Sequence, residues 1–207
     1  MLDDLLKLCF TIRDKQKNYA KWADPIFDKD KTPFGMIFNQ ATLTFELLNF
    51  YYEVWKIPHS STPSDIDETK EENGERIIVI TRWCFIGSIS AIEHCTKEII
   101  KNTSKPEFQE IKNMILKGDR IYLSTIMKQS YDAKLIDEND YTQWDALIFL
   151  RNSAVHNNSI SDKNETLKIG DVEFLCTKGA MLKGKLDTLL KLTDISSDLY
   201  FKWLHIF

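Results

Sequence analysis

The sequence predicts an all-α helical bundle with one small β-hairpin inserted near the C-terminal end. Three observations favour this class. Apolar residues recur at the three- and four-residue spacing of an amphipathic helix through most of the chain. Gly and Pro, which punctuate turn-rich β proteins, number only 7 and 5. Hydrophobic residues make up 43% of the 207 residues and charged residues 28%, so the chain can form a sizeable core and is not wholly disordered.

The N-terminal part, residues 1–57, is expected to contain two helices. Leucines and other apolar residues at helical spacing predict the first of them over 2–20. Thr32 and Pro33 then resemble an N-cap followed by proline at the first helical position. The next run, 34–55, is apolar around much of its circumference, which predicts a long and largely buried helix.

Residues 58–75 are predicted to form a solvated acidic loop. They contain Pro58 and Pro63, two serines and an acidic run over 65–72, a composition typical of loops. Calcium binding by these acids is the weaker alternative, because the spacing of an EF-hand loop is missing. The segment is therefore expected to link the N-terminal helices to the rest of the domain.

Residues 76–207 are expected to complete a single domain that spans 1–207, and to hold the core of the bundle. Helices are predicted over 75–102, 106–117, 121–133, 140–157 and 186–207. The fourth of these opens at Asp140, in a sequence that resembles a capping box. Alternating apolar residues flank Gly170 and Asp171, so a two-residue turn and a small β-hairpin are predicted after this helix.

Composition narrows the classes of function and location. A formal net charge of −4 argues against a protein that coats nucleic acid by general phosphate neutralisation. The cysteines form no CxxC pair, the N-terminus lacks a signal-peptide pattern, and no long uncharged apolar run predicts a transmembrane helix. We therefore expect a cytoplasmic protein without membrane contact. No metal-ligand spacing and no glycine-rich phosphate loop occurs in the sequence, so neither a metal nor a cofactor is expected.

The most informative stretch is the end of the 140–157 helix. Its apolar residues would form one arc, and Arg151 falls in the middle of that arc. A guanidinium is costly to bury without a partner, so Arg151 must meet a carboxylate or line a polar cleft or an interface. His156 lies roughly 140° further round the helix, and Asn152 shares its stripe. The helix dipole favours the protonated form of His156, and a histidine can exchange a proton with a hydroxyl or a leaving group.

The stretch from Arg151 through Asn152 to His156 resembles the signature of the HEPN superfamily (higher eukaryotes and prokaryotes nucleotide-binding). That signature is an Arg, then four to six residues, then a His, on a late helix of an α-helical bundle. The residue after the Arg is typically polar and often Asn. The resemblance covers mainly residues 140–160, including the apolar run before the Arg and the polar residues after the His. It implies a HEPN-like helical bundle.

The resemblance also implies an activity and residue roles. Many HEPN proteins are metal-independent endoribonucleases that act as dimers, with two Arg/His motifs facing each other across a cleft. His156 would be the general acid or base for the ribose 2′-hydroxyl or the 5′ leaving oxygen, and the RNA product would carry a 2′,3′-cyclic phosphate. Arg151 would hold the scissile phosphate and stabilise its developing charge. Asn152 would orient His156 or bind the substrate.

Family members place a further polar residue near the motif, on an earlier helix. Glu93 is the candidate in this chain, and it would be the carboxylate that pairs with Arg151. The alternative is that Glu93 is simply solvated. The resemblance also suggests a toxin or phage-defence effector, a homodimer and a possible antitoxin partner. One toxin subgroup, paired with a nucleotidyltransferase antitoxin, has a Tyr two positions after the His. This chain has Asn158 there, a departure that argues against that particular pairing.

Two other interpretations of the motif stay open at this point. The first is a non-catalytic HEPN module that binds nucleotide or RNA, or serves as a dimerisation scaffold, which the acidic net charge fits at least as well. In the second, Arg151 is ion-paired across the bundle and His156 is hydrogen-bonded at a helix end, and neither is catalytic. The placement of the two side chains distinguishes these hypotheses.

Overall fold

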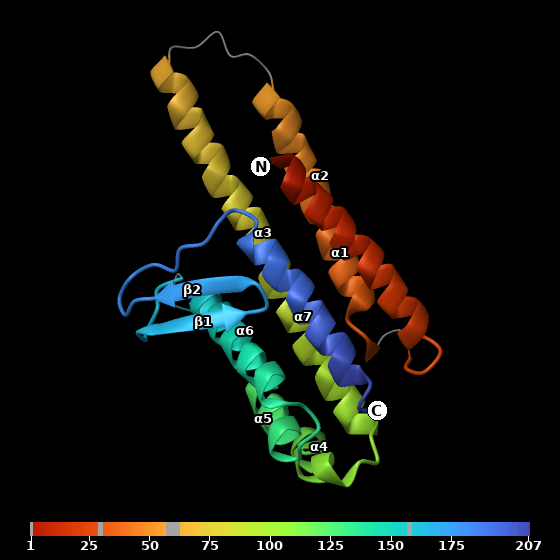
Figure 1. Ribbon diagram of the computed structural model, residues 1–207. Helices are drawn as coiled ribbons and strands as arrows, with labels where there is room; N and C mark the ends of the chain where they lie inside the picture. Colours follow the sequence, from red (N-terminus) through yellow and green to blue (C-terminus); the bar gives the residue numbers. More distant parts are fainter. Residues whose placement is uncertain (1, 29–30, 57–62, 157–158) are drawn as a thin grey trace.

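The computed structural model describes the backbone of residues 2–28, 31–56, 63–156 and 159–207, and the side chains of the same ranges except 52–73. The fold is mostly helical, with one two-stranded sheet in the described part of the chain (Figure 1). Along the chain, the two strands come between the last two helices. The predicted class, all-α with a small hairpin after the helix that carries Arg151, is therefore confirmed.

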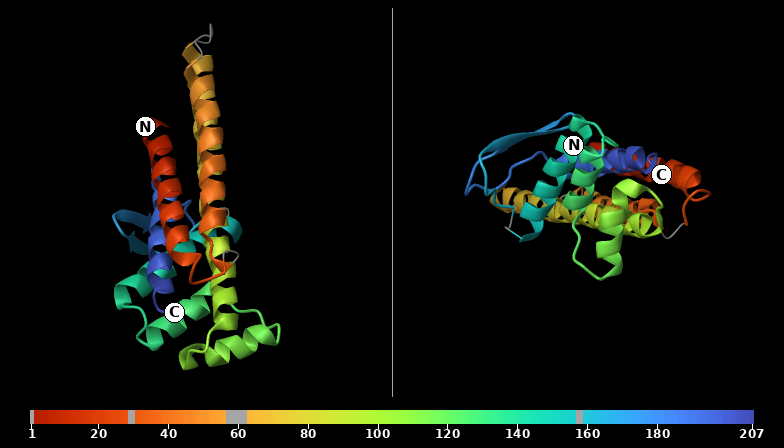
Figure 2. Two further views of the ribbon diagram at one scale, coloured as in Figure 1. Left: turned by 90° about the vertical axis from the view of Figure 1, so that its right-hand side faces the viewer. Right: turned by 90° about the horizontal axis from the view of Figure 1, so that it is seen from below.

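Long helices form the main body of the fold. α1 (Leu2–Ala23) packs against α2 (Phe34–Lys56), α2 packs against α3 (Pro63–Asn102), and α3 packs against α7 (Thr188–Leu204). In Figure 2, α2 and α3 run side by side and extend beyond the rest of the molecule. α7 is shorter at both ends than the helix predicted over 186–207, because 186–187 and 205–206 form turns.

The predicted loop over 58–75 is wrong for most of its length. α3 begins at Pro63 and is helical from there onward, while 57–62 lie outside the described residues. Proline suits the first turn of a helix, where its missing N–H leaves no hydrogen bond unmade. Acidic residues near the N-terminus of a helix interact favourably with its dipole, and Glu and Lys are good helix formers. The acidic run is therefore the start of a helix.

A second group of helices lies beside α3. It consists of η2 (Pro106–Phe108), α4 (Gln109–Leu116), α5 (Leu123–Asp132) and α6 (Glu138–His156). α5 packs against α6, and α6 packs against both α3 and α7. α6 is the helix that carries the motif, so its position between α3 and α5 decides which side chains can surround the motif residues.

α6 begins earlier than predicted, at Glu138. Asp137 Oδ1 accepts a hydrogen bond from the backbone N–H of Asp140 at 2.8 Å, which is the geometry of an N-cap, and this bond holds the pKa of Asp137 below its ordinary value. The predicted capping box at Asp140 is therefore wrong. The Asp140 side chain is buried instead and lies 2.5 Å from Lys202 Nζ of α7. The other end of α6, at His156, lies within one residue of the prediction.

The predicted hairpin is confirmed. β1 (Glu165–Ile169) and β2 (Val172–Cys176) pair antiparallel, with Ile169 opposite Val172. Gly170 has a φ of 57°, as the first central residue of a two-residue hairpin turn requires. Its N–H donates a hydrogen bond to Oε1 of Gln143 in α6 at 2.9 Å. The hairpin is thus fastened to the helix that carries the motif.

α2 is long, as predicted, but it is not largely buried. Leu43, Leu47 and Phe50 lie on one face of the helix and are 56%, 39% and 61% exposed. The reason is that α2 packs mainly against α1 and α3, so its remaining side has no neighbour in the described part of the chain. Among the largest fully buried aromatic residues, Phe34 begins α2, and the others lie in other elements: Phe85, Phe108, Trp144, Tyr200 and Trp203.

One segment of α3, Gly74–Asn102, is long and apolar enough to cross a membrane. However, 44% of its most apolar window is buried inside the fold, and α3 packs against α2, α6 and α7. These are the contacts of a core helix. We therefore interpret the segment as the central helix of the bundle.

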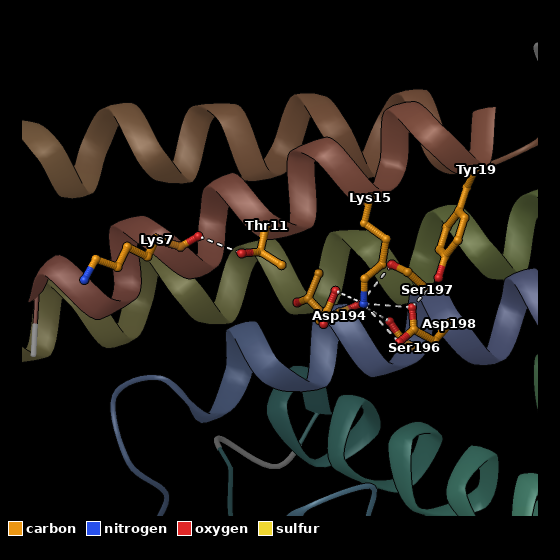
Figure 3. Close-up of polar contacts among 9 residues, drawn as sticks. Lys7, Thr11, Lys15, Tyr19, Asp194, Ser196, Ser197 and Asp198 are labelled. Carbon is orange, nitrogen blue, oxygen red and sulfur yellow. Dashed lines mark hydrogen bonds and ion pairs between the residues drawn. The ribbon is translucent and has the colours of Figure 1, made fainter. Parts of the chain in front are cut away.

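A polar cluster joins α1 to α7 (Figure 3). Lys15 Nζ lies 2.7 Å from Asp194 Oδ1 and 2.9 Å from Asp198 Oδ1. The Tyr19 hydroxyl donates a hydrogen bond to Asp198 Oδ1 at 2.6 Å. Burial raises the pKa of the Asp194 carboxyl, and Lys15 opposes that shift. The cluster therefore fixes the first helix of the chain against the last one.

Candidate active site

Polar side chains from the C-terminal end of α6 line an open cleft. Arg151, Asn152 and His156 all line this cavity, whose volume is about 620 Å³. His156 and Asn152 are exposed, and Arg151 is half-buried. The structure therefore brings the three predicted residues of α6 to one cleft, although Arg151 and His156 are roughly 140° apart around the helix. We call this cavity the motif cleft.

Arg151 has no carboxylate partner among the described residues. Its Nη1 donates a hydrogen bond to Asn152 Oδ1 at 3.0 Å, and its Nη2 donates one to Ser90 Oγ at 3.3 Å. Its Nε is buried and makes no hydrogen bond. Because both acceptors are neutral, no anion compensates the charge of the guanidinium. Such a group is suited to bind an anionic ligand such as a phosphate.

Glu93 lines the same cleft, but its predicted pairing with Arg151 is wrong. Its carboxylate instead accepts a hydrogen bond from Lys97 Nζ at 2.8 Å, one turn further along α3. A pair at i and i+4 on one helix forms without any help from tertiary structure, so it competes well with a partner on another helix. Nor is Glu93 freely solvated, since its side chain is only 19% exposed.

Three side chains that sequence reasoning did not single out also line the cleft: Lys97, Arg120 and Tyr122. The Arg120 guanidinium lies 5.2 Å from the centre of the Tyr122 ring, and that ring is 50% exposed. An exposed aromatic ring next to cationic groups is a typical surface for stacking a nucleobase. No local signal marks Arg120 and Tyr122, because they reach the cleft only through the packing of α5 against α6.

A smaller cavity of about 260 Å³ adjoins the motif cleft. It shares Glu93, Tyr122, Arg151 and Asn152 with the cleft. Its other lining residues are Ile89, Leu123, Ser124 and Ile148, which are mostly apolar. The site therefore offers a cationic part beside an apolar part, a combination that suits a nucleotide, with its charged phosphate and its flat, partly apolar base.

Another hollow, of about 660 Å³, lies between α5, α6 and the end of α7. Its charged lining is acidic on balance, with Asp132, Asp137 and Asp140 against Lys134 and Lys202, and Lys202 is already paired with Asp137 and Asp140. The motif cleft differs, because Arg151 and Arg120 form no ion pair within the described residues. For this reason we regard the motif cleft as the candidate active site.

The chemistry that the motif cleft can perform is acid–base chemistry on a bound anion. An exposed imidazole can accept or donate a proton, and a guanidinium can stabilise negative charge that develops nearby. Within the described residues, no group of three or more His, Cys, Asp or Glu side chains could hold a metal ion.

Comparisons of the chain with known protein families, with curated proteins and with solved structures find no match.

Proposed function

We propose that the chain is a metal-independent endoribonuclease of the HEPN type. The observation that carries this proposal is that Arg151, which has no anionic partner in the described structure, and the exposed His156 line one open cleft. The interpretation in which both residues are purely structural is disfavoured by the same geometry. It requires an ion pair for Arg151, and the structure provides neutral acceptors instead.

In the proposed reaction, neutral His156 takes the proton of a ribose 2′-hydroxyl as its oxygen attacks the adjacent phosphorus. The bond from phosphorus to the 5′ oxygen breaks, and that oxygen takes a proton from an imidazolium. The products are a 2′,3′-cyclic phosphate and a 5′-hydroxyl. Arg151 stabilises the negative charge on the phosphate oxygens during the attack. The nucleophile belongs to the RNA, so the reaction needs no metal-bound water.

The other residues of the cleft would position the RNA. Arg120 would contact a phosphate next to the scissile one, and Tyr122 would stack on a base. Asn152 would hold Arg151 in place through the hydrogen bond at 3.0 Å or contact the ribose. Stacking on an exposed ring requires an unpaired base, so the proposed substrate is single-stranded RNA or a loop.

A homodimer is part of the proposal. Proton removal and proton delivery occur on opposite sides of the phosphorus, and one imidazole reaches both sides poorly. A second copy that places its own His156 and Arg151 across the cleft would supply the other group. A toxin or phage-defence effector in the cytoplasm, held inactive by an antitoxin, is the biological setting that we propose for such an enzyme.

The test is RNA cleavage in EDTA by the purified protein. We expect the wild type to cut, and His156→Ala to slow cleavage by about 10²–10⁴-fold, the usual contribution of a general acid or base. His94→Ala is the matched control, because His94 is an exposed histidine that does not line the cleft. Product ends that lack a 2′,3′-cyclic phosphate, or a wild type that is inert on tRNA and mRNA, would refute the proposal.

The second candidate function is a non-catalytic module that binds nucleotide or RNA. Asp162 lines the cleft as well, and the chain carries a net charge of −4, which favours modest binding over tight retention of a polyanion. Calorimetric binding of a nucleotide by a wild-type protein that cuts no RNA, and loss of that binding in Arg151→Met, would support this alternative.

A further inference from the structure

A further cavity lies on the other side of α6, away from the motif cleft. Its volume is about 400 Å³, which falls within the range of small-molecule sites. It is bounded by α3, α6, α7, the hairpin and the segment that leads into α7. Leu150 and Ala154 of α6 line it, whereas Arg151, Asn152 and His156 line the motif cleft, so the two cavities share no residue.

The wall of this cavity is mostly apolar. The apolar side chains come from four different elements and from the segment between β2 and α7. They are Ile78, Phe85, Leu150, Ala154, Phe174, Met181, Leu182, Leu186, Leu189 and Leu192. A cavity with such a lining is favourable for a hydrocarbon chain or ring, because each buried methylene group gains free energy on leaving water.

The charged groups of the same cavity all have one sign. Arg82, Lys183 and Lys185 line it, and no Asp or Glu is among its described lining residues. Arg82 is half-buried and donates a hydrogen bond to the backbone carbonyl of Ala154. None of the three cations forms an ion pair with a described carboxylate. Three uncompensated cations beside an apolar pocket favour a ligand with an apolar body and an anionic head.

We propose that this cavity binds a small amphipathic carboxylate, such as a medium-chain fatty acid. The chain lies along the apolar wall between α3 and α7, and the carboxylate meets Arg82, Lys183 and Lys185. Because the cavity shares no residue with the motif cleft, this proposal stands or falls independently of the ribonuclease proposal.

The first test is calorimetric titration of the full chain with hexanoate, octanoate and decanoate, each below the concentration at which micelles form. Affinity is expected to rise about two- to fourfold for each methylene that enters the cavity. Decylamine has the same chain as decanoate but a cationic head, and it is expected to bind at least tenfold more weakly. Equal affinity for decylamine and decanoate, or affinity that does not depend on chain length, would overturn the proposal.

The second test uses exposed lysines, so that the variants fold. Lys183→Glu combined with Lys185→Glu is expected to weaken decanoate binding at least tenfold. Lys168→Glu combined with Lys178→Glu is the control, because it changes the net charge equally at exposed positions that do not line the cavity. Retention of wild-type affinity by the first variant would overturn the proposal, as would self-association through this surface without decanoate binding.

Discussion

Replacing Arg151 by Met tests whether this arginine serves binding or the stability of the fold. Met retains much of the apolar stem of the arginine and removes its charge and its donors. Two hydrogen bonds to neutral acceptors are lost, each contributing about 0.5–1.5 kcal/mol. The buried Nε, which has no acceptor, is lost too, and removing a buried donor of this kind recovers about 1–3 kcal/mol. The terms nearly cancel.

We therefore expect the free energy of unfolding of Arg151→Met to lie within about 1 kcal/mol of the wild-type value, which corresponds to a shift in Tm of about 2–4 °C for a chain of this size. Urea unfolding followed by circular dichroism measures it. No new unpaired group is left behind, because the Ser90 hydroxyl still donates to the Ile86 carbonyl at 2.8 Å. The affinity for single-stranded RNA should nevertheless fall by about 10- to 100-fold, as expected for a lost charge-assisted contact.

Arg82→Met is the matched control for the binding measurement. Arg82 is also a half-buried arginine without a carboxylate partner in the described structure, but it faces the other side of α6. It should retain RNA affinity within about threefold, the small effect of a remote charge. Destabilisation of Arg151→Met by more than about 2 kcal/mol would show that the guanidinium has a structural partner, and the reasoning about the motif cleft would be wrong.

Three other measurements test the fold and its thiols. Lys15→Met leaves the mostly buried Asp194 without its cation and should lower the free energy of unfolding by about 2–3 kcal/mol, whereas Lys128→Met, at an exposed pair, should change it by less than about 0.5 kcal/mol. A Cβ on Gly87 would lie 2.3 Å from Gln40 Nε2, so Gly87→Ala should destabilise by about 1 kcal/mol; in a Gln40→Ala background the same change should stabilise by about 0.5–1 kcal/mol, because alanine is the better helix former. Burial raises the pKa of the buried Cys9 and Cys95 thiols to about 12. A disulfide reagent at pH 8 should therefore label the native protein slowly and the urea-unfolded protein at once, and labelling of the native protein should become faster as rising pH increases the thiolate fraction.

Most of the helices and the hairpin could be predicted because their signals are local. Apolar spacing marks a helix whether or not the rest of the fold is known, and a Gly at a hairpin turn satisfies a need of the backbone itself. The prediction of a loop over 63–75 was wrong because the local signal there is ambiguous. Its proline and its acids are equally typical of a loop and of a helix start, and composition alone does not distinguish the two.

The exposed face of α2 and the partners of Arg151 depend on tertiary structure, so the sequence could not predict them. An apolar helix looks buried until the number of its neighbours is known. Likewise, Glu93 had two possible cationic partners, Lys97 on its own helix and Arg151 on α6. The structure pairs it with Lys97, which is the local partner. The i and i+4 spacing of Glu93 and Lys97 on one helix favours this pairing, whereas the place of Arg151 relative to Glu93 is set by how α6 packs against α3.

The local charge of the motif cleft shows why net charge is a poor guide to what a site binds. The chain as a whole carries −4, which argues against a protein that coats nucleic acid by general phosphate neutralisation. Within the cleft, Glu93 and Lys97 compensate each other, and Asp162 is outnumbered by Arg120 and Arg151. A phosphate that enters the cleft therefore meets an excess of positive charge at short range. The acidic groups elsewhere on the surface are screened beyond about 8–10 Å at physiological salt, so they chiefly slow the approach of RNA and oppose its binding only weakly. If the proposal is correct, the affinity for RNA should be modest and should fall with salt according to the few cations of the cleft, and not with the steep dependence of a protein that coats nucleic acid.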